Sequence, residues 1–259
     1  MKQLQKPPPK RFEDALLQLS RTQPIGTVFD DFLDFALLFI RWWEQKHEDY
    51  SALERKYPEV DAAALFAEAY IAMADVADDN GAGFKDPFGD FYMEHLSKSR
   101  SGQFFTPETI CDFMAQIQMG EDVPDNATVT DPCCGSGRLL LSAAKVNRKV
   151  TFYAADIDLT CAKMTLLNFL LNSMCGEVAW MDSLGLKHFR NWKTGKVMLD
   201  NGYYVPYYKI IAPEESAFSQ YQTNQTEEQQ PTTTTPTSSA SSKRRMPKTP
   251  SPQLILEFK

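Results

Sequence analysis

One short segment constrains the fold of this chain more than any other, because it joins a β-prone run to a helix through two glycines. The segment is Asp131-Pro132-Cys133-Cys134-Gly135-Ser136-Gly137, with Val129-Thr130 before it and the predicted start of a helix, Leu139–Ala144, after it. Glycines at such a bend let the main chain turn tightly and approach a ligand closely. A helix that begins there directs backbone N–H groups and the positive end of its dipole towards the bend. The pattern predicts a strand–loop–helix unit, and the loop either holds a nucleotide-like ligand or only connects the two elements.

The residues around the bend indicate which nucleotide-like ligand would fit. A dinucleotide fingerprint needs a third glycine where this chain has Leu140, and a P-loop ends in Gly-Lys-Ser/Thr where this chain has Gly137-Arg138-Leu139. A carboxylate at Asp131 would repel a pyrophosphate but attract an ammonium group. S-adenosylmethionine carries an amino group, a sulfonium and no phosphate, so the sign of the charge favours it.

Two more acids follow predicted strands farther along the chain. Val150–Ala155 reads as a buried strand that ends at Asp156, about twenty residues beyond Gly137, where nucleotide-binding α/β units place an acid against ribose hydroxyls. Glu177–Met181 reads as a third strand that ends at Asp182. The carboxyl ends of parallel strands meet at one edge of an open sheet, so we expect the acids to converge on one crevice. Taken singly, each acid is also compatible with a solvated loop.

Helical patterns flank these strands. Phe12–Ala77 reads as helical, with Thr27 as the predicted cap of a helix whose apolar residues recur at helical spacing as far as Trp43. A second helix, rich in alanine, is predicted from Val60 to Ala77, and another from Thr160 to Met174 after the second strand. We expect the N-terminal helices to form a bundle against the sheet.

The order of these motifs resembles the N6-adenine DNA methyltransferases, specifically the modification subunits of type I restriction systems and their relatives. The resemblance runs from about Asp86 to Leu184 and rests on five elements: Asp86–Leu96, Gly102–Glu108 with its Phe-Phe-Thr-Pro, Asp131–Gly137, Ala155–Asp158 and Asp182–Leu184. It implies an α/β fold with a Rossmann-like S-adenosylmethionine-dependent methyltransferase sheet, an N-terminal helical region, and DNA as the partner that is methylated on adenine N6.

The resemblance also implies a set of cofactor-binding residues. They are Phe105, Thr106, Asp131, Pro132, Cys133, Gly135, Ser136, Gly137, Asp156, Ile157 and Asp182. Phe105 and Thr106 would flank the methionine part of S-adenosylmethionine, and the bend would hold its amino-acid end. Asp156 would bridge the ribose hydroxyls, Ile157 would pack on the adenine face, and Asp182 would accept the adenine amino group. Carboxylates accept hydrogen bonds from hydroxyl and amine donors, so the chemistry of these residues agrees. For one of the pair Phe104-Phe105 we expect core packing.

The acceptor side of such an enzyme is not evident. The family carries Asn or Asp, then Pro-Pro and an aromatic residue, after its fourth strand, where they would hold the target amine and stack on a flipped base. The sequence contains no such tetrad, so no catalytic residue is assigned. The nearest match is Val205-Pro206-Tyr207-Tyr208, in which Val205 offers no acceptor. Lys196–Ile211 instead predicts a β-hairpin around Asp200-Asn201-Gly202.

Two functions from different classes remain open on this sequence. The first is an adenine-N6 DNA methyltransferase of a restriction-modification or mobile-element type, complete or completed by a partner subunit that supplies the missing tetrad or the target recognition. The second is a catalytically inactive accessory protein that binds S-adenosylmethionine or DNA and is recruited to the sliding clamp through its C-terminal tail.

Composition and charge indicate the cellular compartment of the protein and the kinds of partner that it binds. The chain is 43% hydrophobic and 24% charged, with no apolar run of membrane-spanning length, no signal-peptide pattern and five cysteines without metal-ligand spacing. We expect a cytoplasmic protein with reduced thiols, no metal site and no membrane partner. The net charge of −7 argues against a strongly basic DNA-coating protein. Two local basic patches are either phosphate contacts or ordinary solvated faces: Lys98-Ser99-Arg100, and Lys187, His188, Arg190, Lys193 and Lys196 interleaved with Phe189 and Trp192.

The predicted organisation has four parts: a flexible N-terminus (1–11), a helical region (12–100), a methyltransferase-like cofactor-binding domain (101–213) and a disordered tail (214–259). Glu214–Pro252 is filled with Gln, Thr, Ser and Pro, which is typical of disorder. The tail ends in Gln253-Leu254-Ile255-Leu256-Glu257-Phe258, which resembles peptides that bind the bacterial replication sliding clamp. The alternative is an apolar chain end without a partner.

Overall fold

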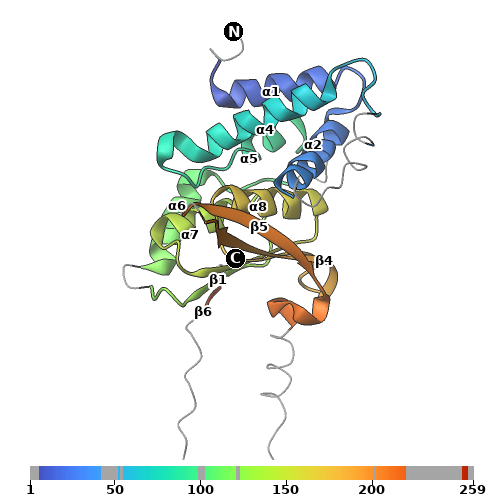
Figure 1. The fold of residues 1–259 in the computed structure, drawn as a ribbon. Helices are drawn as coiled ribbons and strands as arrows, with labels where there is room; N and C mark the ends of the chain where they lie inside the picture. The colour runs from blue at the N-terminus through green and yellow to red at the C-terminus, as the bar shows by residue number, and fades with distance from the viewer. Residues whose placement is uncertain are drawn as a thin grey trace, which may run out of the picture.

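A mixed β-sheet forms the centre of the protein, with helices packed mainly on one of its faces (Figure 1). The computed structural model describes residues 6–41, 52, 55–98, 103–120, 123–200, 202–219 and 253–255. The helices are α1 (Pro8–Leu19), α2 (Ile25–Ile40), α4 (Ala62–Asp78), α5 (Gly89–His95), α6 (Glu108–Met119), α7 (Arg138–Val146) and α8 (Leu159–Leu171), with short 3-10 turns η3 (Asp79–Gly81) and η4 (Pro213–Glu215). The strands are β1 (Thr128–Asp131), β2 (Thr151–Asp156), β3 (Gly176–Asp182), β4 (Lys187–Met198), β5 (Tyr204–Ile211) and β6 (Gln253–Ile255).

The first three strands form a parallel unit in the order β3-β2-β1, and α7 and α8 make the crossovers between them. Parallel neighbours require such a crossover because consecutive strands must run in the same direction. Val129 lies beside Phe152, and Ala154 beside Val178, and all four side chains are fully buried. The predicted α/β fold is confirmed, and the three acids end their strands at the same edge of the sheet.

Helix α8 lies between the sheet and the N-terminal helices, and almost every residue on it is buried. Polar contacts fasten it to α2, since the Thr160 hydroxyl donates to Asp30 (2.8 Å) and Lys163 pairs with Asp34 (2.5 Å). The bundle against the sheet is therefore present as expected.

Three predicted boundaries in the helical region are wrong or shifted. Thr27 does not cap α2, because Pro24 holds the extended backbone before the helix and Ile25 already belongs to it. Helix α1 begins at Pro8, inside the segment predicted to be flexible, since proline suits the first helical turn. Helix α4 begins after Asp61, whose carboxylate accepts from the Ala64 N–H (3.0 Å), close to the predicted start. Trp43 lies outside the described residues.

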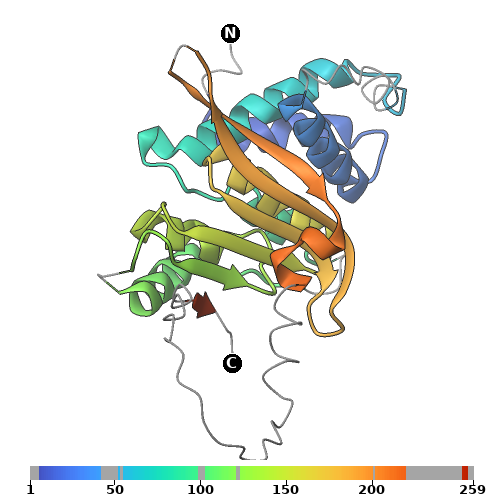
Figure 2. The ribbon, with the colours of Figure 1, turned by 60° about the horizontal axis from the view of Figure 1, so that its bottom comes forward.

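Strands β4 and β5 form an antiparallel hairpin on the outer edge of β3, as Asp200-Asn201-Gly202 predicts. Strand β4 is twelve residues long, against four for β1, and Figure 2 shows the hairpin reaching well past the parallel strands. The hairpin therefore combines a half that packs against β3 with a half that projects from the body.

The sheet face opposite the helices carries the short segment 213–219, visible in Figure 2 at the end of the hairpin. Phe218 packs on the buried Ala155, Ala179 and Met181, and the buried Glu177 carboxylate accepts from the Ser216 hydroxyl (3.1 Å) and the Ala217 N–H (2.9 Å). The prediction of disorder from residue 214 is wrong for residues 214–219, because one aromatic side chain and one buried acceptor fix them to the sheet.

The backbone of Gln253–Ile255 forms β6, which pairs in parallel with β1. Thr128 lies beside Gln253, and Thr130 beside Ile255. The sequence predicted this segment as a docking peptide rather than a strand, and the remainder of that peptide, 256–258, lies outside the described residues. Within the described ranges, no helix is both long and apolar enough to cross a bilayer.

Candidate functional site

A cavity of about 400 Å³ opens at the carboxyl ends of β1, β2 and β3. A smaller hollow of about 70 Å³ shares four of its lining residues and reaches under the bend after β1. The cavity is lined by Gln103, Phe104, Phe105, Pro132, Cys133, Gly135, Asp156, Ile157, Cys161, Asp182, Ser183 and Leu184. Thr106, Asp131 and Ser136 line the hollow. Of the predicted cofactor-binding residues, all but Gly137 therefore line one of these two spaces.

The bend requires glycine at two positions. Gly135 has φ of +55° and Gly137 has φ of +86°, both in the left-handed region that favours glycine. A Cβ atom on Gly135 would lie 3.0 Å from the Phe105 ring, and one on Gly137 would lie 3.0 Å from the Thr165 hydroxyl. The bend is therefore shaped both by its own backbone and by the side chains packed against it.

Asp156 fastens the end of β2 to the bend. Its Oδ2 accepts from the Gly135 N–H (2.9 Å) and its Oδ1 from the Asp158 N–H (2.9 Å). Burial raises the pKa of Asp156, although these backbone hydrogen bonds oppose the shift. Each carboxylate oxygen has a second lone pair, so Asp156 retains capacity to accept from hydroxyls in the cavity.

Asp131 is the most buried of the three strand-end acids, with 1% of its surface exposed. Its Oδ1 accepts from the Cys133 N–H (3.0 Å). Burial raises the pKa of Asp131 to about 7, and the neighbouring charge of Asp156 adds to the shift. A cationic ligand group beside Asp131 would restore its charged form, whereas an anionic group would meet repulsion.

Asp182 and its successors close the third side of the cavity. The Asp182 Oδ1 accepts from the N–H groups of Leu184 (3.0 Å) and Gly185 (2.9 Å), which folds the turn after β3. The Ser183 hydroxyl donates to the Pro132 carbonyl (2.7 Å), so this turn is tied to the bend after β1. The strand ends thus form one connected rim.

Large apolar side chains stand exposed on this rim. Ile157 is 62% exposed, Phe104 79% and Leu184 97%. Phe105, in contrast, packs on Tyr92 with ring centroids 4.8 Å apart and covers Gly135, so the expectation of core packing for one of the two phenylalanines is confirmed for Phe105. Exposed apolar groups around a polar floor are typical of a site that covers a flat ligand.

Sequence reasoning missed a polar network behind the bend, centred on the buried Asp86. This carboxylate accepts from the Ser136 hydroxyl (2.6 Å), Arg138 Nε (2.7 Å) and Asn168 Nδ2 (3.1 Å), and from the backbone N–H groups two and three residues ahead of it (3.0 and 3.1 Å). Arg138 also pairs with Asp90 (2.5 Å). The network joins the segment before α5, the bend and α8. The Ser136 side chain therefore holds the bend in place from behind.

Gln103 and Cys161 also line the cavity, and like Phe104, Ser183 and Leu184 they are not among the predicted cofactor-binding residues. The Gln103 amide oxygen accepts from the Tyr92 hydroxyl (2.9 Å) and lies 3.5 Å from Cys161 Sγ. The only sequence signal for Gln103 is its place directly before the Phe-Phe-Thr-Pro element. Gly102, in the same element, lies outside the described residues.

The segment nearest to an acceptor tetrad, Val205–Tyr208, belongs to β5 and lines neither the cavity nor the hollow. Tyr208 is buried, donates to the Leu37 carbonyl (3.2 Å) and lies under the Arg41 guanidinium. These residues pack the hairpin against α2, so they do not form an acceptor site at the cavity.

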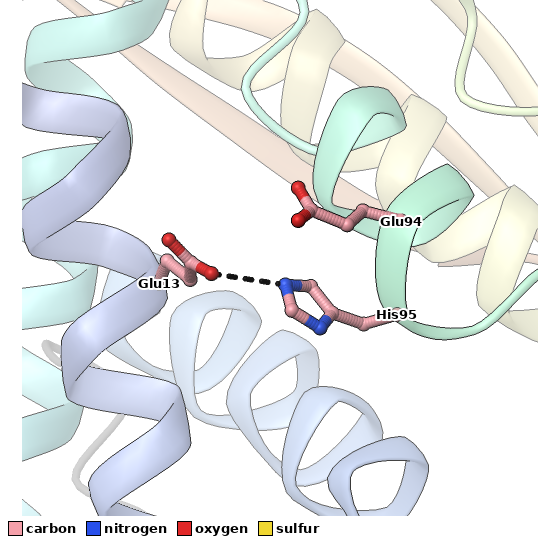
Figure 3. Close-up of side chains that lie close together, drawn as sticks. All are labelled: Glu13, Glu94 and His95. Carbon is pink, nitrogen blue, oxygen red and sulfur yellow. Dashed lines mark ion pairs between the residues drawn. The ribbon is translucent and has the colours of Figure 1, made fainter.

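A separate cluster of titratable side chains joins α1 to α5 (Figure 3). Glu13 on α1 faces His95 on α5, with Oε1 3.2 Å from Nε2, and the exposed Glu94 lies beside them. Lys10 supplies a counter-charge to the other Glu13 oxygen at 2.8 Å. The cluster fastens α1 to the helix that leads into the Phe104-Phe105 element.

Comparisons with known proteins agree on one family. A family model described as N-6 DNA Methylase matches residues 84–240. The Type I restriction enzyme MpnII methylase subunit of Mycoplasma pneumoniae is 35% identical over 102 residues, covering 34% of this chain and 18% of that protein. The Type II methyltransferase M.VspI of Vibrio sp. (strain 343) is 35% identical over 92 residues, covering 34% of this chain and 21% of that protein.

The chain spans about a fifth of the length of these curated relatives. Among solved structures, the type I restriction-modification system methyltransferase subunit from Streptococcus thermophilus is similar over 64% of this chain and 55% of that chain, with 17% identity and a TM-score of 0.32.

Proposed function

Because the chain belongs to the N-6 DNA methylase family, we propose that its strand-end cavity binds S-adenosylmethionine for the methylation of adenine N6 in DNA. The observation that carries the proposal is the convergence of Asp131, Asp156 and Asp182 around the glycine bend. Three acids and a backbone turn suit a ligand that has an amine, a ribose and an adenine but no phosphate. The bound cofactor would supply an electrophilic methyl group.

Each side of the cavity has a role in this proposal. Asp131, with its raised pKa, accepts from the ammonium group and becomes fully ionised on binding. Asp156 accepts from the ribose hydroxyls with the lone pairs that its backbone contacts leave. Asp182 accepts from the adenine amino group, and Ile157 and Leu184 cover the ring, which explains their exposure.

We place the acceptor side of the reaction outside this cavity. The sequence contains no Asn/Asp-Pro-Pro-aromatic tetrad, and Val205–Tyr208 packs on α2 instead. We therefore propose that a partner subunit contributes the residues that hold the flipped adenine, as part of a restriction-modification type of system. The alternative, a catalytically inactive accessory protein that binds the cofactor or DNA, is favoured by the same missing tetrad.

Calorimetry with S-adenosylmethionine tests the cofactor proposal. We expect one binding site per chain, lost in Asp131→Asn and retained in the matched Asp125→Asn, because Asp125 is exposed and paired with Lys149. Absence of binding to the folded wild-type chain would contradict the proposal.

Transfer of a labelled methyl group to unmethylated DNA then separates the two functions. Binding without transfer, also after addition of candidate partner subunits, would identify the accessory protein. Transfer that appears only with a partner subunit would identify the incomplete enzyme.

The sliding-clamp partner stays a prediction. The pairing of Gln253–Ile255 with β1 implies that the peptide would have to leave this edge before it docks elsewhere. Titration of a Gln253–Lys259 peptide onto the clamp is the test, and binding unaffected by Leu256→Ala would exclude the hypothesis.

A further inference from the structure

One group of basic side chains in the described part of the chain is held in ion pairs, namely Lys6, Lys10, Arg11, Lys56, Lys85, Arg138, Lys145, Lys149 and Lys163. The second group lies on the β4–β5 hairpin and consists of Lys187, Arg190, Lys193, Lys196 and Lys209, all exposed. None of these five has an acidic partner among the described residues. The hairpin therefore carries five exposed positive charges in a chain whose net charge is −7.

The strand register places two of these lysines directly opposite each other. Lys193 on β4 pairs with Lys209 on β5, and both side chains are therefore on the same face of the hairpin. Like charges in this arrangement destabilise the strand pair. Glu177 is the neighbour of Lys193 on β3, but it is buried and its carboxylate accepts from Ser216 and Ala217. No ion pair therefore joins Lys193 to this carboxylate among the described residues.

The basic residues also follow the length of β4. Lys187, Arg190, Lys193 and Lys196 recur at every third position, about 10 Å apart along a strand. They occupy both faces of the hairpin, because Lys193 shares its face with Lys209, whereas Arg190 and Lys196 lie on the opposite face. The row begins at Lys187, which lies opposite Asp182 in the strand register without forming an ion pair with it. It therefore begins beside the end of β3 and follows β4, the strand that Figure 2 shows projecting past the parallel strands.

Exposed aromatic rings accompany both ends of this row. Lys187 lies 5.3 Å from the Phe189 ring, and Lys196 lies 5.2 Å from the Tyr204 ring. Phe189 is 42% exposed and Tyr204 57%. Unpaired cations interleaved with exposed rings are the arrangement with which proteins hold a nucleic-acid backbone.

We propose that the β4–β5 hairpin is an arm that binds the phosphate backbone of duplex DNA, with Lys193 and Lys209 as its central contacts. The inference rests on the proposed function in taking DNA as the substrate, and it adds the surface that holds it. The contacts are to phosphates, so they position the duplex beside the cavity without reading its sequence. A phosphate between the two lysines also offsets the repulsion between their charges.

Fluorescence anisotropy with a labelled 20-base-pair duplex, measured over a series of salt concentrations, tests the arm. We expect Lys193→Gln/Lys209→Gln to weaken binding on the order of 10-fold and to lower the slope of log K against log salt by about two, since two phosphate contacts are lost. The matched control is Lys145→Gln/Lys149→Gln, which makes the same change in net charge at lysines already paired with acids. It should leave both quantities near the wild-type values.

An equal loss in the control, or no loss in the hairpin variant, would overturn the proposal, as would tighter binding to an RNA duplex of the same sequence. Circular dichroism checks that both variants are folded. Calorimetry with S-adenosylmethionine on the hairpin variant keeps the two proposals apart. Retained cofactor binding with lost DNA binding supports the arm, whereas a wild-type chain that binds DNA through the hairpin but no cofactor would leave the arm standing and reject the cofactor site.

Discussion

The strand-end cavity and the β4–β5 hairpin belong to one sheet, but they differ in the sign and the burial of their charged side chains. At the cavity, acids are drawn into the protein, and backbone N–H groups hold Asp131, Asp156 and Asp182 in fixed positions. On the hairpin, basic groups are exposed to solvent and form no ion pair in the described part of the chain. The net charge of −7 is therefore distributed unevenly, with acidic side chains at the cavity and basic side chains on the hairpin.

The difference follows from how each region is covered. The parallel strands are packed under α7 and α8, so a charge at their ends is desolvated and needs hydrogen bonds to persist. The hairpin projects past the parallel strands, so its charges keep their hydration and cost little. Substitutions at the cavity should therefore change the unfolding free energy and ligand binding strongly. Substitutions on the hairpin should change the unfolding free energy only slightly.

The largest effect is expected behind the bend. Asp86→Ala removes the acceptor for Ser136, Arg138 and Asn168 and leaves the Arg138 charge without its buried partner. Loss of one member of a buried pair costs about 3–5 kcal/mol of unfolding free energy. Chemical denaturation measures it. Asp90→Ala is the matched control, because Asp90 pairs with the same arginine but is 91% exposed, and its removal should cost less than about 1 kcal/mol. Equal losses of unfolding free energy in the two variants would contradict a stabilising role for the buried network around Asp86.

Asp131→Asn should stabilise the ligand-free protein above pH 7. The folded pKa of Asp131 is about 7, above the ordinary value of 3.8, so the wild type loses stability as pH rises from about 4 to 7 while the variant does not. The difference at pH 8 is at most about 4 kcal/mol. Denaturation at pH 4, 6 and 8 checks it. A difference that does not grow with pH would show that Asp131 is ionised at little cost.

Two glycine substitutions compare the regions directly. Gly135→Ala imposes left-handed strain and brings a methyl group to 3.0 Å from the Phe105 ring, so we expect a loss of about 2–3 kcal/mol. Gly202→Ala, at the hairpin turn, has φ of +82° but no atom within 4 Å, so strain alone should cost about 1–2 kcal/mol. Thermal melts of both variants measure the two losses of stability. A larger loss for Gly202→Ala than for Gly135→Ala would contradict the tighter packing of the bend.

The smallest effect is expected on the hairpin. Lys209→Glu places an opposite charge beside Lys193 and should raise the unfolding free energy by about 0.2–1 kcal/mol, while weakening DNA binding. Lys209→Gln is its control, since it removes the repulsion without adding an attraction. If Lys209→Glu stabilises the protein but leaves the affinity for DNA unchanged, Lys209 does not contact a phosphate.

Local patterns in the sequence indicated those residues of the candidate site that are close together in the chain. The bend, the acids at Asp131, Asp156 and Asp182, and the hairpin around Asn201 each have a signal within a few residues. What the sequence did not reveal depends on contacts between distant segments. Asp86 meets Ser136 fifty positions away, and Phe218 is fixed by strands far upstream, so neither has a periodic or turn signal of its own.

The predicted cap at Thr27 failed for a more local reason. A threonine is a good cap, but Pro24 already fixes the extended residue before the helix three positions earlier. The difference between Phe104 and Phe105 was also beyond the sequence, because it depends on which ring meets Tyr92.

The affinity of the wild-type chain for S-adenosylmethionine, measured as a function of pH, tests whether the cavity binds this cofactor through Asp131. If Asp131 pairs with the ammonium group, it must lose its proton on binding, so affinity should be constant above pH 7 and fall up to about 10-fold for each unit below it. The fall should be absent in any residual binding by Asp131→Asn. Affinity that is unchanged from pH 8 to pH 5, or that rises as pH falls, would contradict the assignment of the cavity.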